Sequence, residues 1–237
     1  MNDLHTHILP QMDDGANQVE MSLQMLRWEH LQGVLSVALT PHYYRKDESI
    51  DEFLLRRDAS YQKLCEGISA LSAEERAQIP KLLLGAEVEW RPNVQNWEGI
   101  ERLCYEGTSC ILIEPPFYDW TDKFFSDLFD LMNTFGLTPV IAHIDRYFDI
   151  APKKYLQRIY EMSIPVQISA ESFLQAKTRR RALDAVKRGN AQLLISDCHD
   201  TFERIPNTAL AKEVIAKRLG EPMVHRISKN TQYLLKI

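Results

Sequence analysis

The chain has 237 residues, of which 45% are hydrophobic and 26% are charged. These proportions are typical of a globular protein and exclude disordered and collagen-like chains. The 28 lysine and arginine residues against 33 acidic ones give a net charge of −5, so we expect no nucleic-acid partner. This length is normal for a single α/β barrel, and we expect one domain over residues 1–237.

The cysteines and the N-terminus bear on the compartment. Cys65, Cys104, Cys110 and Cys198 form no CxxC pair, which favours free thiols in a reducing environment. The chain begins MNDLHTHILP, where a signal peptide would need a basic end followed by an apolar stretch. No apolar run approaches the roughly 20 residues of a membrane span. We therefore expect a cytoplasmic protein without membrane insertion.

Short apolar runs alternate along the chain with longer segments of helical period. The runs cover residues 2–7, 34–40, 81–87, 110–114, 138–143, 165–170 and 191–196. Runs rich in valine, isoleucine and leucine are typical of buried parallel strands. The clearest helical segment is 50–71, where Phe53, Leu54, Tyr61, Leu64 and Ile68 follow a spacing of three and four residues. The alternation predicts repeated βα units and hence the α/β class.

Ionisable residues recur where these strands end. They are His5, His7, His42, Glu87, Glu114, His143, Asp197 and His199, joined by Asp14 from the first loop. In parallel α/β folds the C-terminal ends of the strands gather ligands and catalysts, so we expect these side chains to meet. Five imidazoles and four carboxylates form a donor set for divalent transition metals rather than for Ca²⁺ or a thiolate zinc site.

The HxH pair is the most local part of this pattern. His5 and His7 are two residues apart on a strand, so both side chains point to one face. A histidine at a strand end is often only a polar tip at the surface. A solvated rim would, however, also supply lysine, serine and asparagine, and here nearly every strand end carries a metal-ligand type.

Six segments resemble the ordered motifs of the PHP (polymerase and histidinol phosphatase) superfamily; they are DLHTHILPQMDDGA, TPHYY, GAEVE, LIEPP, VIAHIDRY and SDCHD. Within the superfamily they are most similar to the bacterial metal-dependent protein-tyrosine phosphatases of capsule and exopolysaccharide operons. The resemblance runs from residue 3 to about residue 200, with all six motifs in order.

The resemblance implies a distorted (β/α)7 barrel, the PHP fold, with the active site at the C-terminal ends of the strands and three divalent metal ions. His5, His7, Glu87 and Asp197 would hold the first ion. Glu87 would bridge to a second ion, completed by Glu114 and His143. Asp14, His42 and His199 would hold the third. Manganese is the expected metal, although histidine and carboxylate ligands also accept Fe²⁺, Co²⁺ and Zn²⁺.

The same resemblance predicts the reaction and its partner. The protein would hydrolyse phosphotyrosine on a bacterial tyrosine kinase that regulates capsule or exopolysaccharide synthesis. Three divalent ions would outweigh the four carboxylates and attract a phosphate dianion. The sequence leaves the oligomeric state open, with a homo-oligomer as one possibility.

Arg146 and Asp197 are the candidate catalytic residues. Arg146 can donate two parallel hydrogen bonds to the charge that develops on the phosphoryl group, and the resemblance gives it this role. A surface salt bridge with Asp145 or Asp149 is the simpler alternative. Two ligand assignments also stay open, because Asp13 adjoins Asp14 and Glu89 shares a strand face with Glu87. Either neighbour could be a ligand or support one.

Other functions are weighed against this one. Cys198 and Arg204 fit the C-x5-R pattern of cysteine-dependent tyrosine phosphatases, but the intervening HDTFE has no glycine and adds two acids beside the anion. An amidohydrolase would commonly carry a lysine where this chain has Glu114. Histidinol-phosphate hydrolysis or another PHP phosphoesterase activity could use the same metals. A non-catalytic phosphotyrosine-binding regulator would be expected to have lost a ligand.

The run Arg179-Arg180-Arg181 lies at the start of a predicted helix. We interpret it as a solvated face or an interface rather than a nucleic-acid patch.

Overall fold

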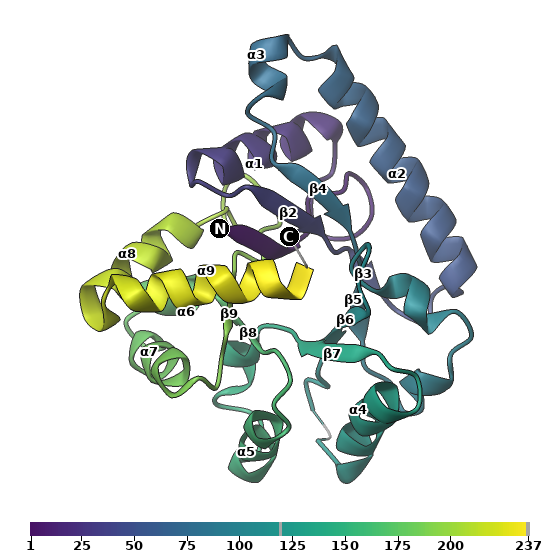
Figure 1. Ribbon diagram of the computed structural model, residues 1–237. Helices are drawn as coiled ribbons and strands as arrows, with labels where there is room; N and C mark the ends of the chain where they lie inside the picture. Colours follow the sequence, from purple (N-terminus) through teal and green to yellow (C-terminus); the bar gives the residue numbers. More distant parts are fainter. Residues whose placement is uncertain (119, 236–237) are drawn as a thin grey trace.

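The structure is a computed structural model that describes residues 1–118 and 120–235 (Figure 1). Its strands are β1 (Asn2–Thr6), β2 (Ser36–Leu39), β3 (His42–Tyr43), β4 (Lys81–Leu84), β5 (Glu87–Glu89), β6 (Cys110–Glu114), β7 (Thr138–Ile141), β8 (Gln167–Ser169) and β9 (Leu193–Ile195). Its helices are α1 (Val19–Leu31), α2 (Ile50–Ala70), α3 (Ala73–Arg76), α4 (Asp122–Asn133), α5 (Lys153–Glu161), α6 (Glu171–Leu174), α7 (Arg179–Arg188), α8 (Thr208–Leu219) and α9 (Glu221–Leu235). Short 3-10 helices span η1 (Val94–Asn96), η2 (Ile100–Leu103) and η3 (Ile144–Tyr147). The protein therefore has a mixed α/β fold, as the alternation of apolar runs predicts.

Each of the seven predicted apolar runs contains a strand, but the prediction of one continuous strand over residues 81–87 is wrong. β4 ends at Leu84, and β5 begins at Glu87 in a different sheet. Pro41, opposite this break, has no N–H to donate to a neighbouring strand. The amides of Gly85 and Glu87 still donate to the carbonyls of Leu39 and Pro41, at 3.0 Å each. Pairing thus continues irregularly across the break and carries Glu87 onward.

All observed strand pairs are parallel. The sheets have the orders β1-β2-β4, β3-β5-β6-β7 and β8-β9. Isolated parallel bridges join Ile141 to Val166 and Thr6 to Cys198, so the edges of neighbouring sheets also contact one another. The C-terminal ends of strands from all three sheets consequently face the same region, as the predicted convergence of ionisable residues requires.

Buried apolar side chains form two clusters. The smaller cluster draws Leu4, Ala38, Leu83, Leu112, Val140 and Leu193 from six different strands, together with Tyr105. The larger cluster includes the apolar faces of the helices that pack around the sheets (Figure 1). Because strand side chains alternate between two faces, one face of each of these six strands contributes to the smaller cluster and the other packs toward helices.

The helix predicted over residues 50–71 is confirmed as α2, which ends one residue earlier. Ser49 caps its N-terminus, since the Ser49 hydroxyl accepts from the Glu52 amide and Glu52 accepts from the Ser49 amide. Phe53 and Leu64 are fully buried along its inner face. Within the described residues, no helix is both long and apolar enough to cross a membrane.

The two leucines of α2 test the packing of this helix. Leu64 is 0% exposed, whereas Leu55 on the same helix is 74% exposed. We expect Leu64→Ala to lower the free energy of unfolding by about 2–5 kcal/mol, because it opens a cavity in the core. Leu55→Ala should change it by less than about 0.5 kcal/mol. Urea denaturation followed by circular dichroism measures both, and similar losses for the two variants would contradict this packing.

Candidate metal centre

The first loop folds back tightly onto the end of β1. The Ala16 amide donates to the His7 carbonyl at 3.0 Å. A Cβ atom on Gly15 would lie 2.1 Å from that same oxygen, so only glycine fits this close approach. The Gly15 amide also donates to Asp13 Oδ1 at 2.9 Å. The local sequence DDG therefore brings Asp13 and Asp14 beside the HxH pair.

Hydrogen bonds orient His5, which lies in β1, and His7, which directly follows this strand. Nδ1 of His5 lies 2.9 Å from Gln167 Oε1, and Nδ1 of His7 lies 2.7 Å from Asp13 Oδ2. Both partners are acceptors, so in the neutral ring each Nδ1 carries the proton and each Nε2 has a lone pair. The two Nε2 atoms are 3.2 Å apart and face the same centre. This is the arrangement of metal-binding histidines with supporting acceptors.

Glu87 lies at the middle of the site. Its carboxylate is fully buried and approaches His143 Nε2 at 2.7 Å and His42 Nδ1 at 2.9 Å. It also lies 3.1 Å from His5 Nε2 and 3.4 Å from His7 Nε2. Burial alone would raise the pKa of Glu87, but the surrounding histidines, His5 first, hold it well below its usual range. One carboxylate therefore connects four of the five predicted histidines.

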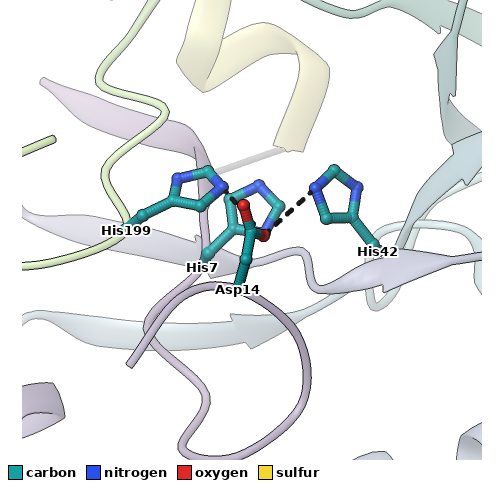
Figure 2. A group of neighbouring side chains, drawn as sticks. All are labelled: His7, Asp14, His42 and His199. Carbon is teal, nitrogen blue, oxygen red and sulfur yellow. Dashed lines mark ion pairs between the residues drawn. The ribbon is translucent and has the colours of Figure 1, made fainter. Parts of the chain in front are cut away.

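Asp14 organises the other end of the site. Figure 2 shows His7, His42 and His199 around this carboxylate. Asp14 Oδ1 lies 3.5 Å from His42 Nε2 and 3.4 Å from His199 Nε2. The rings of His7 and His199 stack with their centroids 3.8 Å apart. Asp14 is the most exposed member of this group, at 63% of its side chain, so this end opens toward solvent.

Glu114 and His143 lie on the side of β6 and β7. Glu114 Oε1 is 3.6 Å from His143 Nε2. His143 and Asp197 both have positive φ angles, of 21° and 55°, which are unfavourable for residues with a side chain. The surrounding structure therefore holds both ligand candidates in strained backbone conformations, consistent with a functional site.

The donor atoms fit divalent cations. Three groups have donor atoms within 4.8 Å of one another; they are His7, Asp14, His42 and His199, then His5, His7 and Glu87, then His42, Glu87 and Glu114. Within the described residues, the buried atoms Glu87 Oε2 and Asp197 Oδ1 accept no hydrogen bond of normal geometry, although both lie within 4 Å of histidine nitrogens. Carboxylate oxygens and histidine nitrogens whose lone pairs face one another at these distances are better satisfied by a shared cation than by direct hydrogen bonds.

Neighbouring charges shift the pKa values in opposite directions. Burial alone would lower the pKa of His7, but the Asp13 carboxylate outweighs burial and raises it to about 9. Burial raises the pKa of Glu114 to about 7. The pKa of His143 falls to about 4, because burial and then the Arg146 guanidinium disfavour its charged form. A cation at His7 must displace a proton at neutral pH, so its binding weakens as the pH falls.

Two arginines border the centre. Arg146 donates to Asp197 Oδ2, and Arg204 donates to the same oxygen at 3.0 Å. Arg204 Nη1 also lies 3.6 Å from Asp14 Oδ2. The salt bridge weighed for Arg146 thus forms with Asp197 rather than with Asp145 or Asp149. The sequence predicted no role for Arg204 at this centre, because Arg204 was considered only as part of a C-x5-R pattern.

Asp13 and Glu89, the two residues whose roles the sequence leaves open, lie in different surroundings. Asp13 accepts from His7 Nδ1 and from the His42 amide, so it supports two ligand candidates at once. Glu89 forms a salt bridge with Arg91 at 2.8 Å, outside the three donor groups. Gln167 of β8, also missed, positions His5 and donates to Tyr105 Oη at 3.1 Å. A glutamine inside a buried strand is the signal that could have found it.

Comparison with known proteins assigns this chain to a family. The sequence profile of the capsular polysaccharide synthesis family CpsB/CapC matches residues 1–236. The chain belongs to the CpsB/CapC family. Two of its relatives are tyrosine-protein phosphatases, YwqE of Bacillus subtilis and CpsB of Streptococcus agalactiae serotype III. The chain is 27% identical to YwqE over all of its own length and 92% of YwqE, and 26% identical to CpsB over all of its length and 98% of CpsB.

A solved structure agrees with the CpsB/CapC assignment. Crystal structures of YwqE from Bacillus subtilis and CpsB from Streptococcus pneumoniae are described as unique metal-dependent tyrosine phosphatases. The match has a TM-score of 0.82 and 26% sequence identity, and it covers all of this chain and 94% of the solved one. The resemblance inferred from the six motifs is therefore confirmed at the level of family and fold.

The Asp13–His7 contact generates a test of the centre. We expect Asp13→Ala to weaken Mn²⁺ affinity by about 10- to 100-fold, because His7 loses the acceptor that fixes its tautomer and orientation. Calorimetric titration of the apoprotein measures the affinity, and circular dichroism checks that the variant is folded. The matched control is Asp58→Ala, whose side chain is 63% exposed and pairs with Arg57. Equal losses in the two variants would contradict a supporting role for Asp13.

Proposed function

We propose that this protein is a metal-dependent protein-tyrosine phosphatase. The observation that carries the proposal is the coincidence of full-length CpsB/CapC membership with a buried centre built from histidines and carboxylates. Relatives over the whole chain are tyrosine-protein phosphatases, and the solved relative is metal-dependent. The manganese preference, the cytoplasmic location and a bacterial tyrosine kinase of polysaccharide export as substrate belong to the same proposal.

The fold that we propose for this reaction is a distorted (β/α)7 barrel in one domain. The parallel pairings, with the two isolated bridges, follow a closed order if β2 with β3 and β4 with β5 each count as one interrupted strand. The smaller apolar cluster, whose members come from six strands, also supports a barrel interior.

We propose three divalent ions at the centre. The residues that would hold them are His5, His7, Asp14, His42, Glu87, Glu114, His143, Asp197 and His199. The three donor groups support this number, although His7, His42 and Glu87 each belong to two of them. When bound, such ions neutralise phosphoryl oxygens and activate water for attack on phosphorus.

The surrounding side chains perform the rest of the reaction. Arg146 and Arg204 both reach Asp197 Oδ2 and would turn their remaining N–H donors toward the phosphoryl group. Asp197 keeps the two guanidinium groups at the rim and, with its other oxygen, faces His5 and His7. A tyrosyl leaving group has a pKa of only about 10, so its departure needs little protonation.

Histidinol phosphatase is the second candidate, because the donor set recognises a phosphoryl group and not the alcohol attached to it. The tyrosine phosphatase is favoured by the full-length relatives.

Metal removal tests the proposed reaction. We expect a chelator to abolish phosphate release from a phosphotyrosyl peptide and Mn²⁺ to restore it, since the charged centre must be rebuilt before phosphate can bind. Histidinol phosphate serves as the parallel substrate. A restored activity on histidinol phosphate alone would assign the other branch, and no release from either substrate after refilling would refute a phosphatase.

A pair of variants separates the metal-dependent reaction from a thiol-dependent one. We expect Arg146→Ala to lower kcat by about 10²- to 10³-fold, since it removes a charged donor from the transition state. Cys198→Ser should keep most of the activity, because burial raises the pKa of the Cys198 thiol well above its usual range. Steady-state hydrolysis of the phosphotyrosyl peptide measures both. An inactive, folded Cys198→Ser variant would favour the cysteine mechanism instead.

A further inference from the structure

A groove lined by basic side chains lies between α5, α7 and the end of α8. Figure 1 shows these three helices on one flank of the molecule. Its volume is about 970 Å³. Among the described residues, eight lysine and arginine side chains line it, against a single acidic one, Asp184. The remainder of the chain has 20 basic and 32 acidic residues. A protein of net negative charge thus concentrates positive charge at one concave surface.

Helix stability does not explain these cations. Arg179, Arg180 and Arg181 form the first turn of α7, where the helix dipole disfavours positive charge. Arg179 is used locally, because it donates to the carbonyls of Phe173 and Leu174.

Several of the basic side chains are left without a counter-charge. Arg181 pairs with Asp149, and Arg188 pairs with Asp184. In the described part of the chain, no ion pair is formed by four other members of the lining, which are Lys153, Arg180, Lys187 and Arg218. These four remain available for an anionic partner.

The bottom of the groove is apolar. Leu156 of α5 and Ala185 of α7 are buried there, and Leu183 and Leu219 are half-buried beside them. Cations around an apolar floor match a peptide segment that combines acidic and apolar side chains.

We propose that this groove binds an acidic segment of the phosphotyrosyl protein on which the phosphatase acts. The inference rests on the proposed function, since it names a docking surface for that substrate. A concave surface with an apolar floor fits an extended peptide better than a flat bilayer. Single-stranded nucleic acid is commonly bound by stacking its bases on aromatic rings, whereas Phe148, one of the two aromatic residues of the lining, is covered by the Arg181 guanidinium, 5.4 Å from its centroid.

An ion pair joins the lining of the groove to that of a second cavity. Asp149, the partner of Arg181, also lines a smaller cavity of about 360 Å³. Arg146, Asp197 and Arg204 line the same cavity. In this proposal an extended peptide passes from the groove along this side of the molecule, so that its phosphotyrosine reaches the centre.

The experiment uses the Mn²⁺-loaded full chain and peptides in which phosphotyrosine is joined to a segment of glutamates and leucines. Glycine–serine linkers of increasing length cover the unknown separation, and glutamine versions provide neutral counterparts. We expect KM for the best-spaced acidic peptide to be about tenfold lower than for its neutral counterpart. The double variant Arg180→Glu, Lys187→Glu should remove this difference.

The matched control is Lys81→Glu, Lys229→Glu, which makes the same charge change at exposed residues outside the groove. It should keep the preference for the acidic peptide. Equal loss in both double variants would overturn the docking site in favour of a general charge effect. Equal KM values for acidic and neutral peptides in the unaltered protein would also overturn it.

Two further outcomes are distinguishable. If the unaltered protein hydrolyses no phosphotyrosyl peptide, the proposed function fails, and fluorescence anisotropy with the labelled acidic segment alone then decides whether the groove binds it. Tighter binding of single-stranded DNA or phosphatidylglycerol vesicles than of the acidic segment, abolished by Arg180→Glu, Lys187→Glu, would overturn the assignment to a peptide.

Discussion

A single buried carboxylate organises the molecule. Glu87 lies within 3.4 Å of nitrogens from His5, His7, His42 and His143, at a depth where an isolated negative charge would be very unfavourable. It is tolerable only because positive charge gathers around it. The strand ends that supply those histidines must therefore stay in register, and the fold and the site depend on the same contact.

Around this contact, several features of the structure position the ligand candidates rather than stabilise the fold. Asp13 and Gln167 lie outside the three donor groups, yet each accepts from the outer nitrogen of a histidine and leaves the inner one directed at the centre. His143 and Asp197 are held at backbone angles that they would not adopt alone. These contacts and backbone conformations hold closely spaced groups of like charge, the carboxylates among them, together until cations bind.

Much of this arrangement follows from the sequence, because its signals are local. Apolar runs of strand length, nearly all ending in or followed by histidine or a carboxylate, predicted the α/β fold. Together with Asp14 of the first loop, they also predicted the nine residues that meet at the centre. The interruption between β4 and β5 was not predicted, since it depends on Pro41, a residue of the neighbouring strand. Arg204 and Gln167 were missed for a similar reason. Their partners, Asp197 and His5, are assigned only by contacts between distant segments.

Cys198 lies between two ligand candidates, yet its side chain is fully buried and its sulfur lies 3.7 Å from the Glu29 carboxylate. Burial raises the pKa of this thiol well above its usual range, and a thiol that stays protonated is a poor nucleophile and reacts slowly with peroxide. Reversible oxidation of a catalytic thiolate, which can switch off cysteine-based phosphatases, therefore has no reactive sulfur to act on at this position.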